Sequence, residues 1–399
     1  MNDIKNSEKL VTSTIELSIV MPCLNEADTL GVCIHKAQES IKKLKISAEI
    51  IVADNGSTDG SQKIAKKLGA RVVDVTEKGY GNALMGGIAA ANGEYVIMGD
   101  ADDSYDFLEI DKFVYKLREG YELVQGCRLP GGGGTVAPGA MPFLHRWWGN
   151  PMFTFFARRW FNAPIHDIYC GLRGFTKQFY VDLNQQCTGM EFATEMIIKG
   201  SLEKAKIAEV PITLHPDGRK AHAPHLKTFR DGWRTLRFFL MYSPRQLFLT
   251  PGIFLIVLGL VGSVAGLSNL HVSDVTFGAH TSLFASLAIL CGYQAVWFAI
   301  FTKVFAINEK LMPPDTRLDR FFSIATLERG LGLGVVSFAV GLALLLAAVH
   351  QWYVVDFGDL DYGHTLRYVI PGMILVFLGF QTILSSFFVS ILGMKRRIS

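Results

Sequence analysis

The chain has 399 residues, 50% of them hydrophobic, and a formal net charge of +3 at neutral pH. A mean hydropathy of +0.27 is too apolar for a wholly soluble enzyme and too polar for a bundle of membrane helices alone, so two unlike parts are expected. The small net charge excludes a large basic surface for nucleic acid, and we expect no nucleic-acid partner.

The chain begins with a polar segment, MNDIKNSEKL, which has no apolar stretch and therefore predicts no cleaved signal peptide. Strand-like and helix-like segments then alternate as far as residue 100. The strands are expected at 16–24, 48–57, 71–76 and 93–100, and the helices at 25–44 and 58–70. This order predicts an α/β fold, a mostly parallel twisted sheet with helices on both faces.

Polar clusters follow three of these strands: NEAD at 25–28, DNGSTDG at 54–60 and DADD at 100–103. Each cluster alone is what an ordinary turn would show, since Asn, Asp, Gly and Ser are turn formers. However, ligands of parallel sheets bind beyond the carboxyl ends of the strands, and all three clusters fall there. Together they favour a binding site. The glycine-rich segment KGYGNALMGG at 78–87 is equally consistent with a loop that opens a helix.

Asp100 and Asp102 stand two residues apart at a strand end, where two carboxylates can share a hard cation. Mg²⁺ or Mn²⁺ typically takes one or two carboxylates and completes its coordination with substrate phosphates. We therefore expect this pair to clamp a metal–diphosphate, with Mg²⁺ or Mn²⁺ as cofactor. Asp54, at the neighbouring strand end, is expected to accept hydrogen bonds from a nucleobase. Neither a Walker-A motif nor GxGxxG is present where a P-loop or dinucleotide enzyme needs it.

The ordered motifs VMPCLNEADTL, VADNGSTDGS, GYGNALMGG and GDADDSYDF resemble those of family 2 inverting glycosyltransferases, which have the nucleotide-diphospho-sugar (GT-A) fold. IHDIYCGLRGFTKQ and EVPITLHPDGRK continue the resemblance into the polyprenyl-phosphate branch, which includes dolichyl-phosphate mannose and glucose synthases. The resemblance covers roughly residues 16–230. It implies a GT-A domain that uses a nucleotide-diphosphate sugar as donor.

The resemblance also assigns roles to individual residues. It implies that Asp100 contacts the donor, that Asp102 binds the metal together with Asp100, and that Arg128 lies near the diphosphate. These three are the expected catalytic residues. Ser104 departs from the family, because many relatives carry Gln there as a further metal ligand, and GRKAHAPHLK lacks the usual Gly-x-Ser-Lys. The expected donor-binding residues are Pro22, Leu24, Asn25, Glu26, Asp54, Asp100, Ala101 and Asp102.

Four apolar stretches follow, at about 250–269, 281–305, 330–350 and 368–392, each near or above the ~20 residues needed to cross a bilayer. We therefore expect an integral membrane protein with three parts. These are a GT-A domain over 1–225, an amphipathic interfacial segment over 226–248 and a domain of four transmembrane helices over 249–399.

The amphipathic segment, HLKTFRDGWRTLRFFL, places apolar residues on one helical face and basic residues beside it, so it should lie among lipid headgroups. Its apolar residues are Leu226, Phe229, Trp233, Leu236 and Leu240, and its basic ones Lys227, Arg230, Arg234 and Arg237. A core helix with solvated arginines is the alternative. Residues 142–161 mix Trp, Phe and Arg in a similar way and are a second candidate for membrane contact.

Combining these parts gives transfer of a hexose from a nucleotide-diphosphate sugar to a polyprenyl phosphate, such as undecaprenyl or dolichyl phosphate. Its phosphate oxygen is already largely ionised at pH 7, so no dedicated base is needed, and a single displacement inverts the anomeric carbon. UDP-glucose is favoured over GDP-mannose as donor. Arginine forks and lysine charges suit the acceptor phosphate. The candidates are Arg128, Arg173, Arg219, Lys220 and Lys227.

Two other functions stay open. One is a glycosyltransferase that acts on a lipid or polysaccharide hydroxyl, with Glu191 or Glu195 as base. The other is a lipid-carrier translocation or assembly module, although few charges lie in the apolar stretches. The sequence also leaves a homo-oligomer open, and it does not fix the length of the polyprenol.

Flanking charge predicts the topology, since Lys and Arg concentrate in cytoplasmic loops. Basic residues fill the middle loop (Lys310, Arg317, Arg320 and Arg329) and the tail (Lys395, Arg396 and Arg397), whereas the other two loops carry only Arg367. The first domain, the middle loop and the tail are therefore expected in the cytoplasm of a bacterial-type cell.

Cysteine labelling tests this topology. Cysteines introduced at positions 315 and 398 should react only from the cytoplasmic side, because they flank the basic segments. Those at positions 275 and 358 should react only from outside. A reversed pattern at any one of these positions would overturn the four-helix topology.

Overall fold

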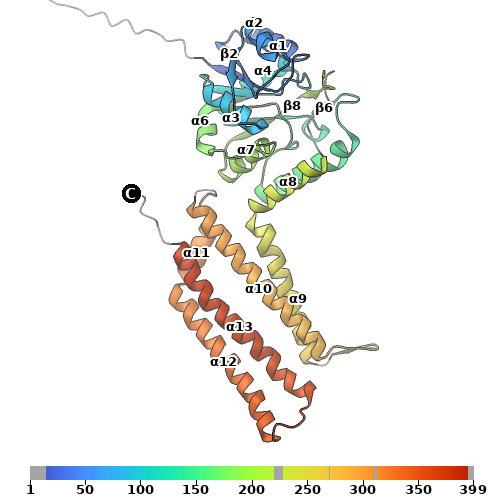
Figure 1. Ribbon diagram of the computed structural model, residues 1–399, viewed down its shortest axis with the longest axis vertical. Coiled ribbons are helices and arrows are strands. Elements are labelled where there is room, and N and C mark those ends of the chain that lie inside the picture. Colours follow the sequence, from blue (N-terminus) through green and yellow to red (C-terminus); the bar gives the residue numbers. More distant parts are fainter. Residues whose placement is uncertain (1–14, 220–227, 269, 310–311, 394–399) are drawn as a thin grey trace, which may run out of the picture. The chain divides into compact units, whose positions relative to one another are not determined.

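The computed structural model describes residues 15–219, 228–268, 270–309 and 312–393 (Figure 1). Contacts divide the chain into two compact units, Met1–Phe239 and Leu240–Ser399. The first unit is an α/β domain and the second is dominated by long helices. The two unlike parts that the composition predicts are therefore present.

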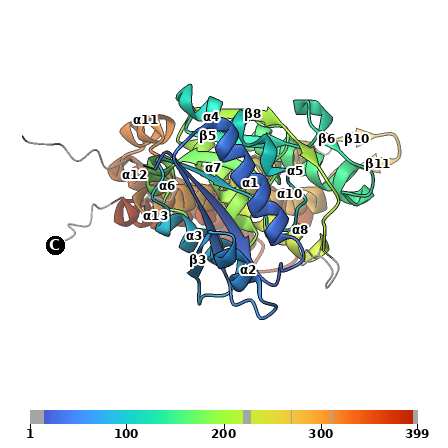
Figure 2. The ribbon, with the colours of Figure 1, turned by 90° about the horizontal axis from the view of Figure 1, so that it is seen from above.

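The first unit is built on a seven-stranded sheet (Figure 2). Its strands are β1 (Leu17–Cys23), β2 (Ala48–Asp54), β3 (Arg71–Asp74), β4 (Tyr95–Met98), β5 (Leu123–Cys127), β7 (Arg173–Thr176) and β8 (Ile207–Pro211). The order is β3-β2-β1-β4-β7-β5-β8. β1 pairs in parallel with β2 and β4, whereas β7 runs antiparallel to both β4 and β5. The predicted α/β class is confirmed, with one reversed strand.

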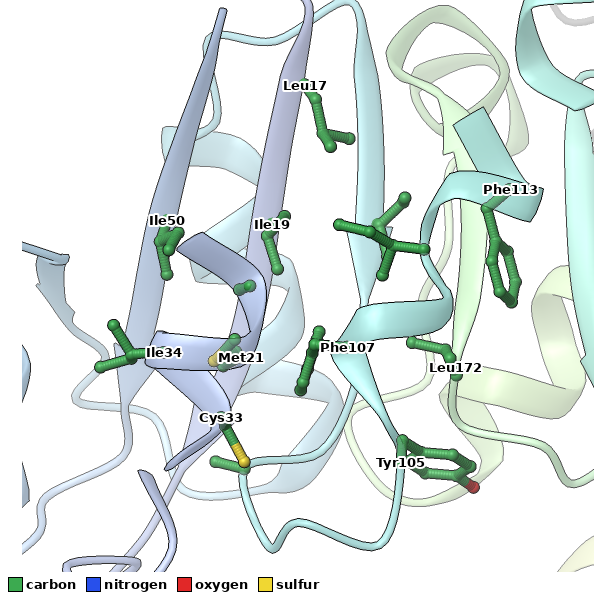
Figure 3. Close-up of a cluster of buried hydrophobic side chains, with 14 of the residues drawn as sticks. Leu17, Ile19, Met21, Cys33, Ile34, Ile50, Tyr105, Phe107, Phe113 and Leu172 are labelled. Carbon is green, nitrogen blue, oxygen red and sulfur yellow. The ribbon is translucent and has the colours of Figure 1, made fainter. Parts of the chain in front are cut away.

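Helices cover both faces of the sheet. The helices of this part of the chain are α1 (Leu30–Leu44), α2 (Ser61–Lys67), α3 (Tyr80–Ala90), α4 (Asp111–Arg118), α5 (Asn150–Phe161), α6 (Lys177–Leu183), α7 (Glu191–Leu202) and α8 (Thr228–Met241). Alternate residues of β1 point to opposite faces. Leu17, Ile19 and Met21 join the core under α1 and α4, which contributes Phe113, as Figure 3 shows.

The glycines of α3 let this helix pack closely on the other face of the sheet, opposite α1 and α4. A Cβ atom on Gly87 would come within 2.6 Å of Val20 and 2.9 Å of Ala53, and one on Gly81 within 2.4 Å of the carbonyl oxygen of Cys187. The segment 78–87 is thus a turn that opens a helix, and its glycines serve close packing.

Short elements connect the larger ones. The 3₁₀ turns are η1 (Phe107–Glu109) and η2 (Pro130–Gly132), and two π-helical turns are η3 (His145–Gly149) and η4 (Arg245–Leu249). Two small strand pairs join β6 (Thr135–Val136) to β9 (Thr213–Leu214) and β10 (His271–Val272) to β11 (Val275–Thr276).

The predicted amphipathic segment forms α8, which packs on α5 through aromatic rings. Phe239 is fully buried, and its ring lies 5.8 Å from Phe153 and 5.5 Å from Phe161 between centroids. On α8, Trp233 is instead 61% exposed. Within the second aromatic segment, Trp148 is 69% exposed. Both segments therefore present aromatic rings to solvent beside an anchored face.

The second unit contains four helices long and apolar enough to cross a membrane, within the residues described. The spans are Arg245–Leu267, Ala279–Asn308, Leu327–Val354 and Tyr362–Leu392. The last three correspond to α10 (Ala279–Asn308), α12 (Leu327–Val354) and α13 (Tyr362–Leu392), and the first joins η4 to α9 (Thr250–Leu267). The predicted middle loop contains a further short helix, α11 (Thr316–Ile324). The prediction of four spanning helices is confirmed, and each is longer than its apolar stretch.

Glycines at seven-residue spacing hold these helices together in two hairpins. On α9, Gly252, Gly259 and Gly266 face α10; a Cβ on Gly259 would lie 2.6 Å from the carbonyl oxygen of Ala285. On α12, Gly341 approaches α13, and its Cβ would lie 2.6 Å from the amide nitrogen of Val376. Small residues allow such close approach of helix backbones within a bilayer.

The substitution Gly341→Leu should therefore force α12 and α13 apart. Overpacking a tight contact typically costs about 1–3 kcal/mol, so the melting temperature of the purified protein in detergent should fall by several degrees. Gly332→Leu is the matched control. Gly332 lies on the same helix, and a Cβ atom there would meet no other atom within 4 Å. Equal melting temperatures for the two variants would contradict the glycine contact.

Candidate functional site

The carboxyl ends of β1, β2 and β4 meet at one edge of the sheet, because these strands are parallel neighbours. Glu26 follows β1, Asp54 ends β2, and Asp100 and Asp102 follow β4. The three polar clusters singled out in the sequence therefore belong to one edge.

Asp102 is held by its own loop and by a distant arginine. One carboxylate oxygen, Oδ1, accepts hydrogen bonds from the backbone N–H and the hydroxyl of Ser104, at 3.0 and 2.6 Å. The other, Oδ2, lies 3.1 Å from Nη1 of Arg219. Asp100 accepts a hydrogen bond from the Tyr80 hydroxyl at 2.9 Å. Ser104, the departure from the family pattern, thus orients Asp102.

Desolvation, and after it the negative charge of Asp102, raise the pKa of Asp100 to about 7. The Tyr80 hydroxyl and Arg219 act in the opposite sense. Two carboxylates this close do not both ionise readily without a cation beside them. The Asp100–Asp102 pair is therefore chemically suited to hold a divalent metal ion, whose charge would keep both ionised.

Among the described residues, Arg219 is the cation that pairs with both Glu26 and Asp102. Its Nε donates to both carboxylate oxygens of Glu26 at 3.0 Å, and its Nη2 donates to one of them at 2.7 Å. The backbone around it is tied to the Asp102 loop, because the N–H of Gly218 donates to the carbonyl of Asp102 at 2.9 Å. Desolvation lowers the pKa of Arg219, but the hydrogen bonds to Glu26 and the charge of Asp102 raise it above its usual value.

Asp54 is almost wholly buried, and its two oxygens differ. Oδ2 accepts hydrogen bonds from the backbone N–H groups of Gly56 and Ser57 and from the side chain of Gln62, at 3.0, 3.0 and 2.7 Å. Oδ1 has no hydrogen-bond partner among the described residues. Desolvation raises the pKa of Asp54, but these hydrogen bonds outweigh it and lower the pKa below its usual value. An ionised oxygen therefore remains available for an N–H donor.

The other predicted donor-binding residues lie on the same edge. The Asn25 side chain accepts the N–H of Thr58 at 2.8 Å, which joins the loops after β1 and β2. Pro22 and Leu24 are half-buried beside them. Ala101 is buried, and its carbonyl accepts the Thr29 hydroxyl at 2.6 Å. The predicted set thus surrounds the strand ends.

Arg128 forms a buried, bidentate ion pair with Asp167, a residue to which the sequence assigns no role. Nε and Nη2 of Arg128 lie 2.7 and 2.8 Å from the two Asp167 oxygens, and Nη1 lies 3.3 Å from the hydroxyl of Tyr105. Tyr105 in turn accepts the N–H of Gly171 at 2.7 Å. A Cβ on Gly171 would come within 2.9 Å of Asp100, so this network reaches the Asp100 loop.

The remaining predicted acceptor residues are placed differently. Arg173 is fully buried, with its terminal nitrogens donating to the backbone carbonyls of Ala193 and Cys170. Burial lowers its pKa. Arg173 therefore supports the core of the sheet, and its predicted role towards the acceptor stays untested. Lys220 and Lys227 lie outside the described residues.

Of the two candidate bases, Glu195 is fully buried and already engaged. It accepts the backbone N–H groups of Gln186 and Cys187 and pairs with Lys199 at 2.8 Å. The loop that it holds packs on α3, where Asn82 donates to the carbonyl of Thr188. Glu195 thus has a structural role here, and Glu191 is only partly buried at the start of α7.

Comparison with known proteins gives two matching family models. "Glycosyl transferase family 2" matches residues 18–183, and "Glycosyltransferase family 2 C-terminal transmembrane region" matches residues 300–393. Both halves of the chain are therefore matched by models with related descriptions.

Two relatives from Haloferax volcanii are similar to this chain. Low-salt glycan biosynthesis hexosyltransferase Agl6 is 35% identical over 94% of this chain and 89% of the relative. Dolichyl-phosphate hexose transferase is 30% identical over 54% of this chain and 89% of the relative. Among solved structures, glucosyl-3-phosphoglycerate synthase from Mycobacterium tuberculosis with Mn²⁺, UDP and glucosyl-3-phosphoglycerate has a TM-score of 0.46 and 22% identity, covering 57% of this chain and 80% of that one.

The geometry predicts that Asp167 is essential for the fold around Arg128. Removing one partner of a buried ion pair typically costs about 3–5 kcal/mol, so Asp167→Ala should lower the melting temperature strongly. Asp167→Asn, which keeps a hydrogen-bond acceptor, should cost less.

Glu16→Ala is the matched control, because the Arg118–Glu16 pair has a similar distance of 2.6 Å but lies at the surface. Exposed pairs contribute about 0–1 kcal/mol. If Asp167→Ala melted like Glu16→Ala, the buried pair would not have the role assigned to it.

Proposed function

The chain belongs to glycosyltransferase family 2, and we propose that it transfers a hexose from a nucleotide-diphosphate sugar to the phosphate of a membrane polyprenyl phosphate. The observation that carries this proposal is the grouping of Glu26, Asp100, Asp102 and Arg219 at one edge of the sheet. The four long apolar helices support a lipid acceptor. The relative named dolichyl-phosphate hexose transferase supports the same class of acceptor.

The donor would bind across the strand ends. Asp54 would offer one ionised oxygen to an N–H of the base, and the loop after β4 would face the diphosphate. Asp102 and Asp100 would hold Mg²⁺ or Mn²⁺, which fits their carboxylate chemistry and the raised pKa of Asp100. When bound, such an ion neutralises charge on the departing nucleoside diphosphate. UDP-glucose remains the favoured donor, ahead of GDP-mannose.

In the proposed reaction, a phosphate oxygen of the acceptor attacks the anomeric carbon of the sugar. The new bond forms as the bond to the nucleoside diphosphate breaks, and the configuration inverts. A phosphomonoester has a second pKa near 6 and is largely dianionic at pH 7, so no side chain needs to remove a proton. The engagement of Glu195 by backbone N–H groups and Lys199 is consistent with this.

Arg219 is the proposed ligand of the acceptor phosphate because it contacts Asp102 directly, whereas Arg128 pairs with Asp167 and Arg173 is fully buried. Arg128 would then position the Asp100 loop through Tyr105. The exposed rings of Trp148 and Trp233 suit the headgroup layer, where amphipathic aromatic side chains gather. We also propose that the glycosyltransferase domain, the middle loop and the tail face the cytoplasm. The proposed boundaries are 1–225 for the glycosyltransferase domain, 226–248 for the amphipathic segment and 249–399 for the membrane domain.

Transfer assays with purified full-length protein test the proposal. UDP-glucose, other UDP-hexoses and GDP-mannose would each be offered with undecaprenyl phosphate or with free undecaprenol. We expect sugar on the phosphate and none on the alcohol, and we expect EDTA or Asp102→Asn to abolish transfer while the protein stays folded. Glycosylation of the free alcohol would refute the phosphate nucleophile, and full activity in chelator would refute the metal.

A further inference from the structure

We propose that Arg219 is the counter-ion of the metal–diphosphate site in the ligand-free protein, and that a divalent cation with its nucleotide must displace it before it can bind the acceptor phosphate. This inference rests on the proposed function. What it adds is the role of Arg219, whose side chain would pass from the carboxylates to the acceptor phosphate.

All three nitrogens of the Arg219 guanidinium face carboxylates. Nε and Nη2 bind Glu26 at 3.0 and 2.7 Å, and Nη1 lies 3.1 Å from Asp102 and 3.8 Å from Asp217. The Arg219 side chain is only 14% exposed. In this arrangement the guanidinium fork is already occupied and cannot take a phosphate as well.

Arg219 and a metal ion would compete for the same oxygen. Oδ1 of Asp102 is taken up by Ser104, which leaves Oδ2, the atom that Arg219 contacts, for a cation. A divalent ion held by Asp102 would place its positive charge beside the Arg219 guanidinium, and like charges repel. Binding one therefore opposes binding the other.

Either cation would offset the negative charge of the carboxylates at this edge. Within the described part of the chain, no other Lys or Arg forms an ion pair with Glu26 or Asp102. Without a cation, the carboxylates of Glu26, Asp100 and Asp102 would repel one another and any incoming phosphate. While Arg219 neutralises these carboxylates, its guanidinium is not free for a phosphate. An acceptor phosphate should therefore bind poorly until a metal ion has replaced Arg219.

The exchange needs only a side-chain movement. The backbone on the N-terminal side of Arg219 is pinned to the Asp102 loop by the N–H of His215 on the carbonyl of Ser104 and by the N–H of Gly218 on Asp102, both at 2.9 Å. A displaced guanidinium thus stays tethered beside the diphosphate. It can then contribute its charge-assisted hydrogen bonds to the acceptor phosphate.

The first test measures Mn²⁺ binding without nucleotide, from the loss of the free-ion EPR signal, with full-length protein in detergent. Mutually opposed ligands typically alter each other's affinity about 5- to 150-fold, so Arg219→Gln and Arg219→Ala should bind Mn²⁺ at least about five-fold more tightly than the wild type. Arg219→Lys should lie between. Arg118→Ala, which removes a surface arginine paired with Glu16, should change nothing.

Unchanged or weaker Mn²⁺ binding in Arg219→Gln would overturn the counter-ion role. Arg219→Gln keeps a hydrogen-bond donor towards Glu26, so its folding can be checked separately from Arg219→Ala. This test needs no sugar transfer. A wild type that bound no Mn²⁺, alone or with nucleotide, would refute both the counter-ion role and the metal part of the proposed function. Mn²⁺ binding with the same affinity in the wild type and in the Arg219 variants would refute the counter-ion role alone.

The second test measures binding of farnesyl phosphate, a soluble short polyprenyl phosphate, with and without Mn²⁺ and UDP, and with GDP in a parallel series. In the wild type, metal and nucleotide should raise the affinity for farnesyl phosphate at least about five-fold, because they free Arg219. In Arg219→Gln this gain should disappear. Equal affinity in the wild type with and without metal and nucleotide would overturn the proposed transfer of Arg219 to the acceptor phosphate.

Discussion

The parallel pairing of β1 with β2 and β4 places four carboxylates at one edge of the sheet, where their negative charges repel one another. They belong to Glu26, Asp54, Asp100 and Asp102. Their negative charges are not all compensated in the same way. Backbone N–H groups hold Asp54, whereas Arg219 neutralises Glu26 and Asp102. Asp100 is compensated least, and its pKa is accordingly raised.

The buried ion pair of Arg128 and Asp167 also supports this edge of the sheet. Arg128 and Asp167 are both almost wholly inaccessible to water, and Tyr105 links them to the backbone at Gly171. Gly171 precedes the reversed strand β7 by two residues, and β7 separates β4 from β5. The antiparallel strand therefore does more than extend the sheet. It places the Arg128–Asp167 pair next to the Asp100 loop.

Local patterns in the sequence predict much of this structure. The α/β class, family 2 membership and the four spanning helices are confirmed, because strand alternation, motif order and apolar length are each visible within short windows. The reversed β7 and the role of Asp167 were not predicted. The Arg219–Glu26 pair joins residues 193 positions apart, and no local pattern reports such a contact. The assignments of donor and acceptor residues stay predictions.

The glycine contacts between helices have a consequence for how a long lipid meets this protein. Within each hairpin the backbones approach so closely that even a methyl group would collide, as at Gly259 and Gly341. α10 and α13 are joined as well, by the hydroxyls of Tyr293 and Thr382 and by the rings of Phe301 and Phe388. An isoprenoid tail has no room to thread through any of these contacts. For the proposed acceptor, the hydrocarbon chain would therefore remain in the surrounding bilayer and approach sideways, with only its phosphate leaving the lipid phase.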